Sequence, residues 1–193
     1  MQSIILASAS PRRAEILNQL GLDFELIPSE VSETIPNQSA FPNDLVTKLA
    51  WRKASNVAGK IERGLVIGAD TLVVLGETIF GKPSDSDEAV KMLSILNGKT
   101  HSVYTGIAMI QVPSGQTEVG YSKTKVKFKT FSLEEIRFYV ATGEPLDKAG
   151  AYGIQGKGGV LVEAIEGCYF NVVGLPLSKL ADMLRKFQIS IWK

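Results

Sequence analysis

The chain is organised around the stretch Gly64-Leu65-Val66-Ile67-Gly68-Ala69-Asp70-Thr71-Leu72-Val73-Val74-Leu75. Its two aliphatic runs, Leu65 to Ile67 and Leu72 to Leu75, have the length and composition of buried strands. Between them, Gly68 and Ala69 remove side-chain bulk, which predicts room for a ligand beside the backbone. We therefore expect two buried strand segments that flank a ligand-binding position.

Asp70 stands between these two runs as a carboxylate in strongly apolar surroundings. Burying a charge is unfavourable unless the charge is paired, hydrogen-bonded or bound to a metal. The turn Gly81-Lys82-Pro83 supplies a cation a few residues later. A lone aspartate more often caps a turn or a helix, but the apolar flanks and the nearby cation favour a catalytic or metal-binding carboxylate at Asp70.

The composition limits the class of protein. The 193 residues are 45% hydrophobic and 21% charged, which is typical of a globular protein and fits one domain over residues 1–193. A net charge of +1 and the lack of a long apolar run favour neither nucleic acid nor a membrane as partner, and predict a cytoplasmic protein. The single cysteine, Cys168, excludes an intrachain disulfide and is expected to be buried. With His101 as the single histidine, the chain has too few cysteine and histidine ligands for a zinc site.

The N-terminal pattern predicts a strand, a loop of small residues and a helix. Ile4 to Ala7 form the strand, and Ser8-Ala9-Ser10-Pro11-Arg12-Arg13 follows, with Ser10 as the expected helix cap. Free backbone N–H groups at a helix start, together with two arginines, suit a phosphate or another anion. The alternative is that Ser10 only caps the helix and both arginines face solvent.

Periodicity predicts most of the remaining elements. Helices are expected to begin near Asn43, Ser86, Ser132 and Gly174, and Ser132 forms a capping-box pattern with Glu135. Strands are expected over residues 24–27, 103–112, 125–129 and 160–162. The helix after Asn43 carries three cations, of which one facing inward would contact a phosphate: Lys48, Arg52 and Lys53.

The segment from Glu144 to Gly159 contains too many glycines for a regular helix or strand. It also contains apolar residues and the ionisable pair Asp147 and Lys148, which a fully exposed flexible loop would not need. We expect a loop that wraps a ligand with backbone groups, while the amide of Gln155 presents a donor and an acceptor to a base edge or a ribose.

Six short motifs follow one another along the chain: Ser8-x-Ser10-Pro11-Arg12-Arg13, Gly68-Ala69-Asp70-Thr71, Gly81-Lys82-Pro83, Thr105-Gly106, the run from Glu144 to Gly156, and Val173-Gly174-Leu175-Pro176-Leu177. Together they resemble the Maf family over almost the whole chain. The resemblance implies an α/β protein with an inosine-triphosphatase-like fold, in which a long bent mixed sheet flanked by helices forms two lobes around a central cleft. It also implies a house-cleaning nucleoside triphosphate pyrophosphatase linked to cell-division arrest.

The same resemblance implies roles for individual residues. Asp70 matches the catalytic base, and Asp70 and Glu33 match carboxylates that hold the metal, although which of them binds metal and which acts as base stays open. Substrate choice is associated with Arg12, Thr71 and Gln155, and phosphate contact with Ser8, Arg13, Lys53 and Lys82. The expected cofactor is Mg²⁺, with Mn²⁺ or Co²⁺ as alternatives, and the expected partner is a nucleoside triphosphate, with a homodimer left open.

Substrate choice within the family rests on two short runs. Gly-Ala-Asp-Thr over 68–71 and Gly-Ile-Gln-Gly over 153–156 resemble the branch that acts on dTTP and UTP, and by extension on 5-modified pyrimidine triphosphates. A 7-methyl-GTP pyrophosphatase is the alternative within the family. A non-catalytic nucleotide-binding regulator of septum formation is the alternative from another class, and a carboxylate placed beside a triphosphate argues against it.

Overall fold

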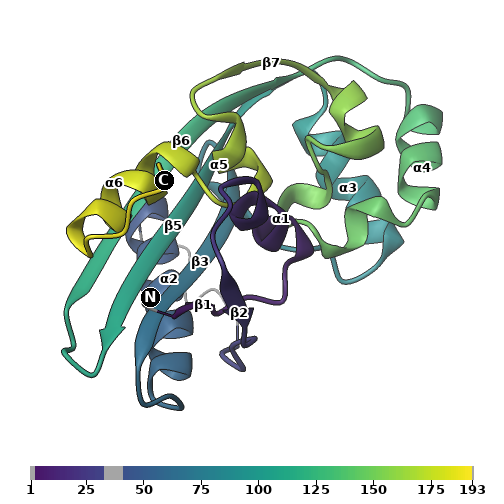
Figure 1. Cartoon of the computed structure of the whole chain (residues 1–193). Coiled ribbons are helices and arrows are strands. Elements are labelled where there is room, and N and C mark those ends of the chain that lie inside the picture. Colours follow the sequence, from purple (N-terminus) through teal and green to yellow (C-terminus); the bar gives the residue numbers. More distant parts are fainter. Residues whose placement is uncertain (1–2, 33–40, 193) are drawn as a thin grey trace.

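The computed structural model describes residues 3–32 and 41–192, which form a mixed α/β fold (Figure 1). Its helices and strands are β1 (Ile4–Leu6), α1 (Pro11–Gln19), β2 (Phe24–Leu26), α2 (Pro42–Ala58), β3 (Gly64–Leu75), β4 (Thr78–Phe80), α3 (Ser86–Leu96), β5 (Thr100–Val112), β6 (Thr117–Phe128), α4 (Leu133–Ala141), η1 (Glu144–Asp147), η2 (Ala149–Ala151), η3 (Gly156–Leu161), β7 (Val162–Glu166), α5 (Tyr169–Val173) and α6 (Leu177–Lys186). The described strands form one sheet in the order β2-β1-β3-β5-β6-β7, with β4 also paired to β3. The β1 pairings with β2 and β3 are parallel and the others are antiparallel, so the predicted mixed sheet is confirmed.

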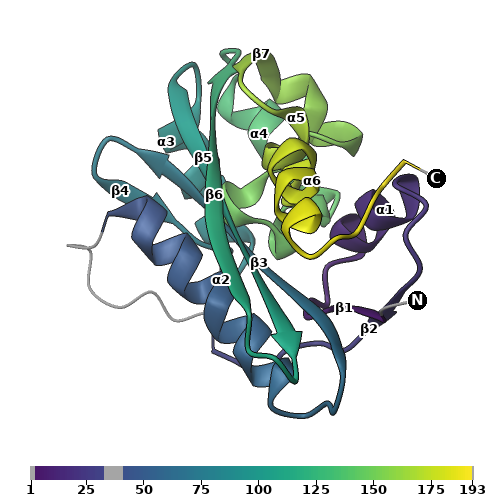
Figure 2. The ribbon, with the colours of Figure 1, turned by 60° about the vertical axis from the view of Figure 1, so that its left-hand side comes forward.

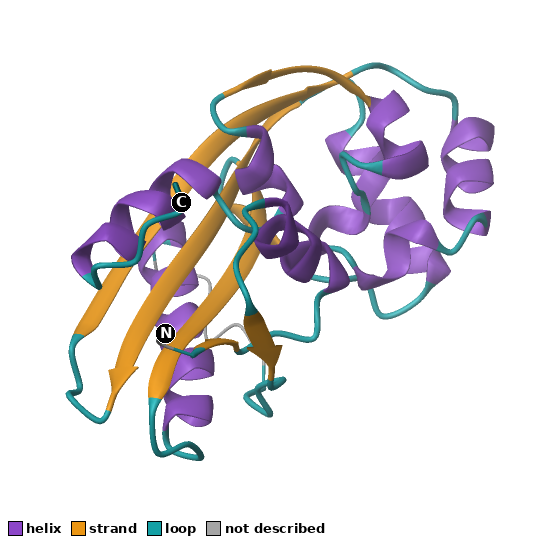
Figure 3. Ribbon diagram, viewed as in Figure 1, coloured by secondary structure: helices purple, strands orange, loops and turns teal. Residues whose placement is uncertain are grey.

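Helices cover both faces of the long strands (Figure 2). The apolar stripe of α2, which includes Leu49 and Ala50, packs on β3 and β5 from one side. On the other side, α1 and α6 enclose one hydrophobic core with the first half of β3, and α3 and α4 enclose a second core with its last residues. These two cores give the chain two lobes that share one sheet, as the sequence predicted (Figure 3).

The central strand β3 is continuous, whereas the sequence predicted two segments separated at Asp70. It has 12 residues, and it pairs with β5 in unbroken antiparallel register from Gly64 to Val74. Because β5 offers a backbone partner at each of these positions, the polar side chain of Asp70 does not interrupt the strand. The carboxylate therefore projects from a rigid strand at the centre of the sheet, which holds it more firmly than a loop would.

The role predicted for Gly68 is also wrong. A Cβ atom added at Gly68 would collide with the backbone of Ala50 and Ala54 in α2, and one added at Gly106 of β5 would collide with the backbone of Val46. These two neighbouring glycines allow helix α2 to lie close against the sheet. Gly68 therefore makes room for a helix and not for a ligand.

Several local predictions differ in detail from the structure. Ser10 occupies the N-cap position of α1, but its side chain makes no capping hydrogen bond. The N-cap of α2 is Phe41 and not Asn43, since the proline after Phe41 fits the first helical position. Residues 160–161 belong to a 3₁₀ turn that precedes β7, and Cys168 is only half-buried.

Among the described residues, no helix is both long and apolar enough to cross a membrane. The cytoplasmic location, the extent of the single domain and the homodimer stay predictions.

The single histidine, His101, lies in the second core without a catalytic environment. Its ring meets Phe128 and Tyr152 edge to face, with ring centroids 4.8 Å and 5.3 Å away. Nε2 shares a hydrogen bond of 2.7 Å with the hydroxyl of Tyr152, and Nδ1 has no hydrogen-bond partner among the described residues. Burial disfavours the charged ring and lowers the pKa of His101 from 6.5 to about 4.

This buried ring predicts a specific loss of stability in acid. The unfolded chain binds a proton on His101 below its ordinary pKa of 6.5, but the folded chain does so only below about 4, so stability falls as the pH drops between these values. We expect the wild type to lose about 2 kcal/mol more unfolding free energy than His101→Gln between about pH 7 and about pH 5. Urea unfolding of both proteins at the two pH values measures this difference, and equal losses would contradict it.

Candidate functional site

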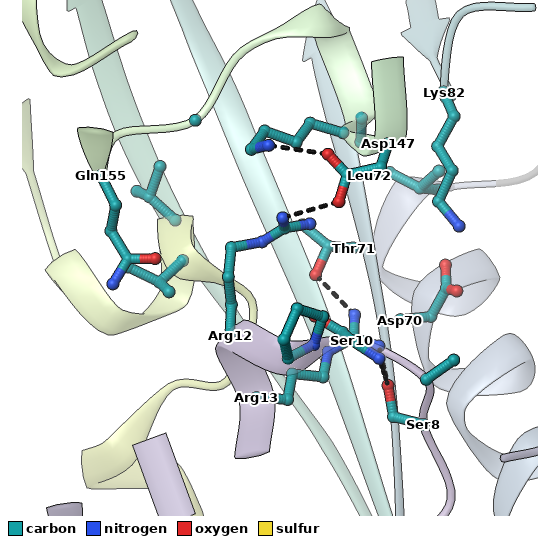
Figure 4. Close-up of a pocket in the computed structure, with 18 of the residues that line it drawn as sticks. Ser8, Ser10, Arg12, Arg13, Asp70, Thr71, Leu72, Lys82, Asp147 and Gln155 are labelled. Carbon is teal, nitrogen blue, oxygen red and sulfur yellow. Dashed lines mark hydrogen bonds and ion pairs between the residues drawn. The ribbon is translucent and has the colours of Figure 1, made fainter. Parts of the chain in front are cut away.

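A cleft opens at a gap along one edge of β3 (Figure 4). On this edge β1 pairs with residues 65–67 and β4 pairs with residues 73–75, so Asp70, Thr71 and Leu72 lie between the two covering strands. Ser8 follows β1 and Lys82 follows β4, which places them on the two sides of the gap. The cleft has a volume of about 690 Å³, enough for a ligand of nucleotide size.

The cleft is strongly cationic. Its cationic side chains outnumber its carboxylates five to two among the described residues that line it: Arg12, Arg13, Lys53, Lys82 and Lys148 against Asp70 and Asp147. Such an excess in a concave, partly desolvated site favours a ligand with several negative charges. Every site residue predicted from the sequence lines this cleft except Glu33, which lies outside the described residues.

Asp70 and Lys53 form a buried ion pair at the floor of the cleft. Their side chains approach to 2.6 Å between Nζ and Oδ1, and Lys53 and Asp70 are only 6% and 5% exposed, respectively. Lys53 comes from the inner face of α2, whereas Lys48 on the same helix is exposed. The ion pair compensates the buried charge of Asp70, which the sequence analysis required. It also fixes the direction in which the carboxylate points.

Arg13 ties three separate parts of the chain together. Its guanidinium donates to Ser8 Oγ at 3.1 Å, to Thr71 Oγ1 at 3.2 Å and to the carbonyl of Gly174 at 2.8 Å. Arg13 is buried, so it links these three parts of the chain and also places a cation beside the cleft. Because two of its nitrogens bind hydroxyls that also line the cleft, a phosphate near Ser8 would meet a pre-arranged set of donors.

The hydroxyl of Thr71 has a defined orientation because of the residues behind it. Thr105 Oγ1 donates to the carbonyl of Asn171 at 2.8 Å, so Thr105 must accept the hydrogen bond of 3.0 Å that it shares with Thr71. Thr71 then donates inward and accepts from Arg13. The lone pair that remains on Thr71 can accept a hydrogen bond from a ligand.

Arg12 reaches across the cleft to the glycine-rich segment. It pairs with Asp147 at 2.8 Å, and Lys148 pairs with the other oxygen of the same carboxylate at 2.7 Å. Partial burial acts to raise the pKa of Asp147, but the hydrogen bonds from Lys148 and Arg12 outweigh it and hold that pKa below its ordinary value. The sequence singled out Asp147 and Lys148 only as an ionisable pair and gave no sign of their contact with Arg12.

Gln155 and Lys82 occupy opposite sides of the cleft (Figure 4). The Lys82 side chain points toward the Asp70 carboxylate, while Gln155 extends from the glycine-rich loop on the far side of Arg12. The Gln155 amide makes no hydrogen bond within the described part of the chain, and the residue is half-buried. Its donor and its acceptor are therefore both available to a ligand.

Apolar side chains complete the cleft wall, and the sequence did not predict most of them. They come from β3, from the glycine-rich segment and from α5: Leu72, Ala149, Ile154, Val172 and Val173. Helix α5 was itself missed because it spans only five residues, too few to show helical periodicity. An apolar wall beside a cationic floor suits a ligand with a flat, weakly polar part and an anionic tail.

The described residues fit a divalent cation only in a limited way. They contain no cluster of three or more histidine, cysteine, aspartate or glutamate side chains that could hold a metal ion. Mg²⁺ binds through one or two carboxylates together with phosphate oxygens of its substrate, so the single cleft-floor carboxylate of Asp70 suits a metal that arrives with a nucleotide. The predicted contribution of Glu33 lies outside the described residues.

Fold and site together define an α/β protein with a cationic cleft that suits a ligand with several negative charges. The chain belongs to the Maf-like protein family, whose family model matches residues 3–187. It is 53% identical over 191 residues to the dTTP/UTP pyrophosphatase of Desulforamulus reducens, covering 99% of this chain and 100% of that protein. It is 51% identical over 191 residues to the dTTP/UTP pyrophosphatase of Pelotomaculum thermopropionicum, with the same coverage.

The fold is shared with a more distant solved structure. A HAM1 protein from Coxiella burnetii superposes with a TM-score of 0.50 at 15% sequence identity, over 96% of this chain and 100% of that one. This likeness confirms the predicted arrangement of a long mixed sheet with helices on both faces.

Proposed function

We propose that this chain is a nucleoside triphosphate pyrophosphatase that hydrolyses dTTP and UTP, and their 5-modified relatives, to the monophosphate and pyrophosphate. The observation that supports this most directly is the position of Asp70, a buried carboxylate among cations in a cleft that also holds Gln155. The two relatives described above carry the name dTTP/UTP pyrophosphatase and align over their full length. The link to cell division stays a prediction.

In the proposed reaction, Asp70 takes the proton of the attacking water. Lys53 orients the carboxylate through Oδ1, so the same edge of Asp70 faces each bound substrate. Ser8, Arg13 and Lys82 bind the phosphates and stabilise the negative charge that develops on the leaving pyrophosphate. A divalent cation, proposed as Mg²⁺ and held by Asp70 and phosphate oxygens, would polarise the phosphoryl group.

We assign substrate choice to the side of the cleft that carries Gln155. Gln155 would face the base edge, with Ile154 and the α5 residues of the apolar wall against the base. Thr71, beside Arg13, keeps a lone pair that can accept a hydrogen bond from the ligand, and Arg12 must exchange part of its contact with Asp147 for the ligand if it is to bind phosphate. The ion pair between Arg12 and Asp147 would therefore differ between the free and the nucleotide-bound protein.

Product analysis with a panel of substrates tests the proposal. The purified protein is incubated with Mg²⁺ and with dTTP, UTP, CTP, dGTP or 7-methyl-GTP in isotopically labelled water. We expect the fastest turnover with dTTP and UTP, and the oxygen label in the monophosphate or the pyrophosphate. Label found only in orthophosphate would exclude a pyrophosphatase. A preference for 7-methyl-GTP would favour the 7-methyl-GTP pyrophosphatase branch of the family. Binding without turnover would favour a non-catalytic nucleotide-binding regulator.

A further inference from the structure

The loop that carries Gln155 is held at both ends by one pair of side chains. We define the Gln155 loop as residues 153–158. Glu144 accepts backbone hydrogen bonds from Lys157 at 3.0 Å through Oε2 and from Gly158 at 2.9 Å through Oε1. Tyr139 donates its hydroxyl hydrogen to Glu144 at 3.0 Å and accepts from the backbone N–H of Gly153 at 3.3 Å. Glu144 and Tyr139 therefore bracket Gln155 from before and after.

The packing around this bracket leaves little freedom to the loop. A Cβ atom at Gly156 would lie 2.9 Å from Oε2 of Glu144, and one at Gly158 would collide with the hydroxyl of Tyr139. Gly156 also has a φ of 65°, a backbone conformation that favours glycine. The glycines of the loop thus allow the chain to close tightly on the carboxylate, and the carboxylate in turn defines where the loop lies.

The charge of Glu144 is suited to this role. Partial burial acts to raise its pKa, but the backbone hydrogen bonds from Gly158 and Lys157 outweigh it and hold that pKa below the ordinary value. An ionised carboxylate offers only acceptors, and three donors are aimed at it here. No neutral side chain of the same shape can accept from all three donors with both of its terminal atoms.

Residues 144–148 also hold Arg12, the second of the side chains that are predicted to select the substrate. Lys148 donates to the backbone carbonyl of Glu144 and pairs with Asp147, which in turn pairs with Arg12. The side chain of Glu144 therefore holds the Gln155 loop while its backbone is tied to the contact that places Arg12. Two residues predicted to select the substrate are positioned from one point in the chain.

We propose that Glu144 is a positioning residue for substrate selection, which sets the place of Gln155 relative to Arg12 without touching the nucleotide. This inference rests on the proposed function, because it assumes that Gln155 contacts the base. Glu144 is not among the residues that line the cleft. Its effect must therefore pass through the loop and not through direct contact with the substrate.

The variant Glu144→Gln tests the proposal with almost no change in size. One terminal atom becomes an NH₂ group that faces a backbone N–H, so the loop loses one acceptor and relaxes. We expect the preference for dTTP and UTP over dGTP, measured as the ratio of kcat/KM values, to fall about tenfold. Most of the change for dTTP should appear in KM, since Asp70 and its cations are untouched.

A matched control and a double variant separate positioning from general damage. Glu163→Gln removes a surface carboxylate of β7 that pairs with Lys127 at 2.8 Å, and it should leave the preference unchanged. In a Gln155→Ala background, Glu144→Gln should change the preference by less than about twofold, because the group that it positions is gone. Unfolding curves identify any variant that fails to fold, and Tyr139→Phe then serves as the milder substitution at the same bracket.

The outcomes also separate this inference from the proposed function. If the wild type prefers a purine triphosphate, the proposed substrate is wrong, and Glu144→Gln must still shrink whatever preference the wild type shows. An unchanged preference in a folded Glu144→Gln protein, or an equal effect of this substitution with and without Gln155, would overturn the role of Glu144.

Discussion

The Asp70→Asn variant should bind nucleotide almost normally and lose nearly all turnover. Asparagine is close to isosteric with aspartate, but it cannot take a proton from water and binds a divalent cation more weakly. Removing a general base lowers kcat by roughly a hundredfold to ten-thousandfold. We expect a loss in this range for dTTP with Mg²⁺, measured as pyrophosphate released, together with a much smaller change in the dissociation constant of a non-hydrolysable analogue.

The buried partner of Asp70 determines how this experiment must be controlled. Leaving a buried charge without compensation destabilises a protein by about 3–5 kcal/mol. In Asp70→Asn the amide oxygen can still accept from Lys53, so we expect a smaller loss of unfolding free energy. Asp182→Asn, which alters an exposed carboxylate of α6 paired with Arg185, should keep wild-type activity. Near wild-type kcat in Asp70→Asn would remove Asp70 from the catalytic role.

Features that depend on neighbouring residues alone could be predicted from the sequence. The capping box of Ser132 and Glu135 forms with both of its hydrogen bonds, because its donors and acceptors lie within one helical turn. The alternation over 125–129 gives buried Val126 and Phe128 between exposed lysines at the end of β6 and just after it, since a strand with one covered face has a period of two residues.

Features that depend on a distant partner could not be predicted in the same way. The continuity of β3 through Asp70 is set by β5, in which Gly106, the partner of Asp70, lies 36 residues further along the chain. The bulk of α2, and not a ligand, explains Gly68. The local sequence showed a polar residue between two apolar runs in the first case and a small residue in the second. The structural role of each depends on the element that packs against it.

The candidate site shows the same division. Asp70 was predicted from its apolar flanks, but its pairing with Lys53 joins a strand to a helix through two residues that are 17 positions apart. The bridge from Arg12 to Asp147 spans 135 residues, and no sequence pattern indicates it. Residue types that suit phosphate and base binding could thus be predicted, whereas the contacts that orient them could not.

If Gln155 faces the base as proposed, one amide would serve both dTTP and UTP. The amide offers one donor and one acceptor to the cleft, and uracil and thymine present the same carbonyl and N–H edge to such a pair. The methyl group that distinguishes thymine lies elsewhere on the ring and can contact the apolar wall. Because this pairing uses only the base edge, it does not depend on the presence of a 2′-hydroxyl on the sugar.

Replacing Gln155 with glutamate should therefore remove the preference for pyrimidines. An ionised carboxylate keeps the acceptor for the N–H group but loses the donor and places a negative charge against the base carbonyl. A site built to hydrogen-bond its substrate discriminates strongly when one partner is lost, so we expect kcat/KM for dTTP and UTP to fall at least about a hundredfold relative to dGTP and 7-methyl-GTP. Steady-state kinetics of the four triphosphates measure this shift, with Gln19→Glu at the exposed end of α1 as the control. A Gln155→Glu protein that retained its full preference for dTTP and UTP would show that the base lies against another part of the cleft.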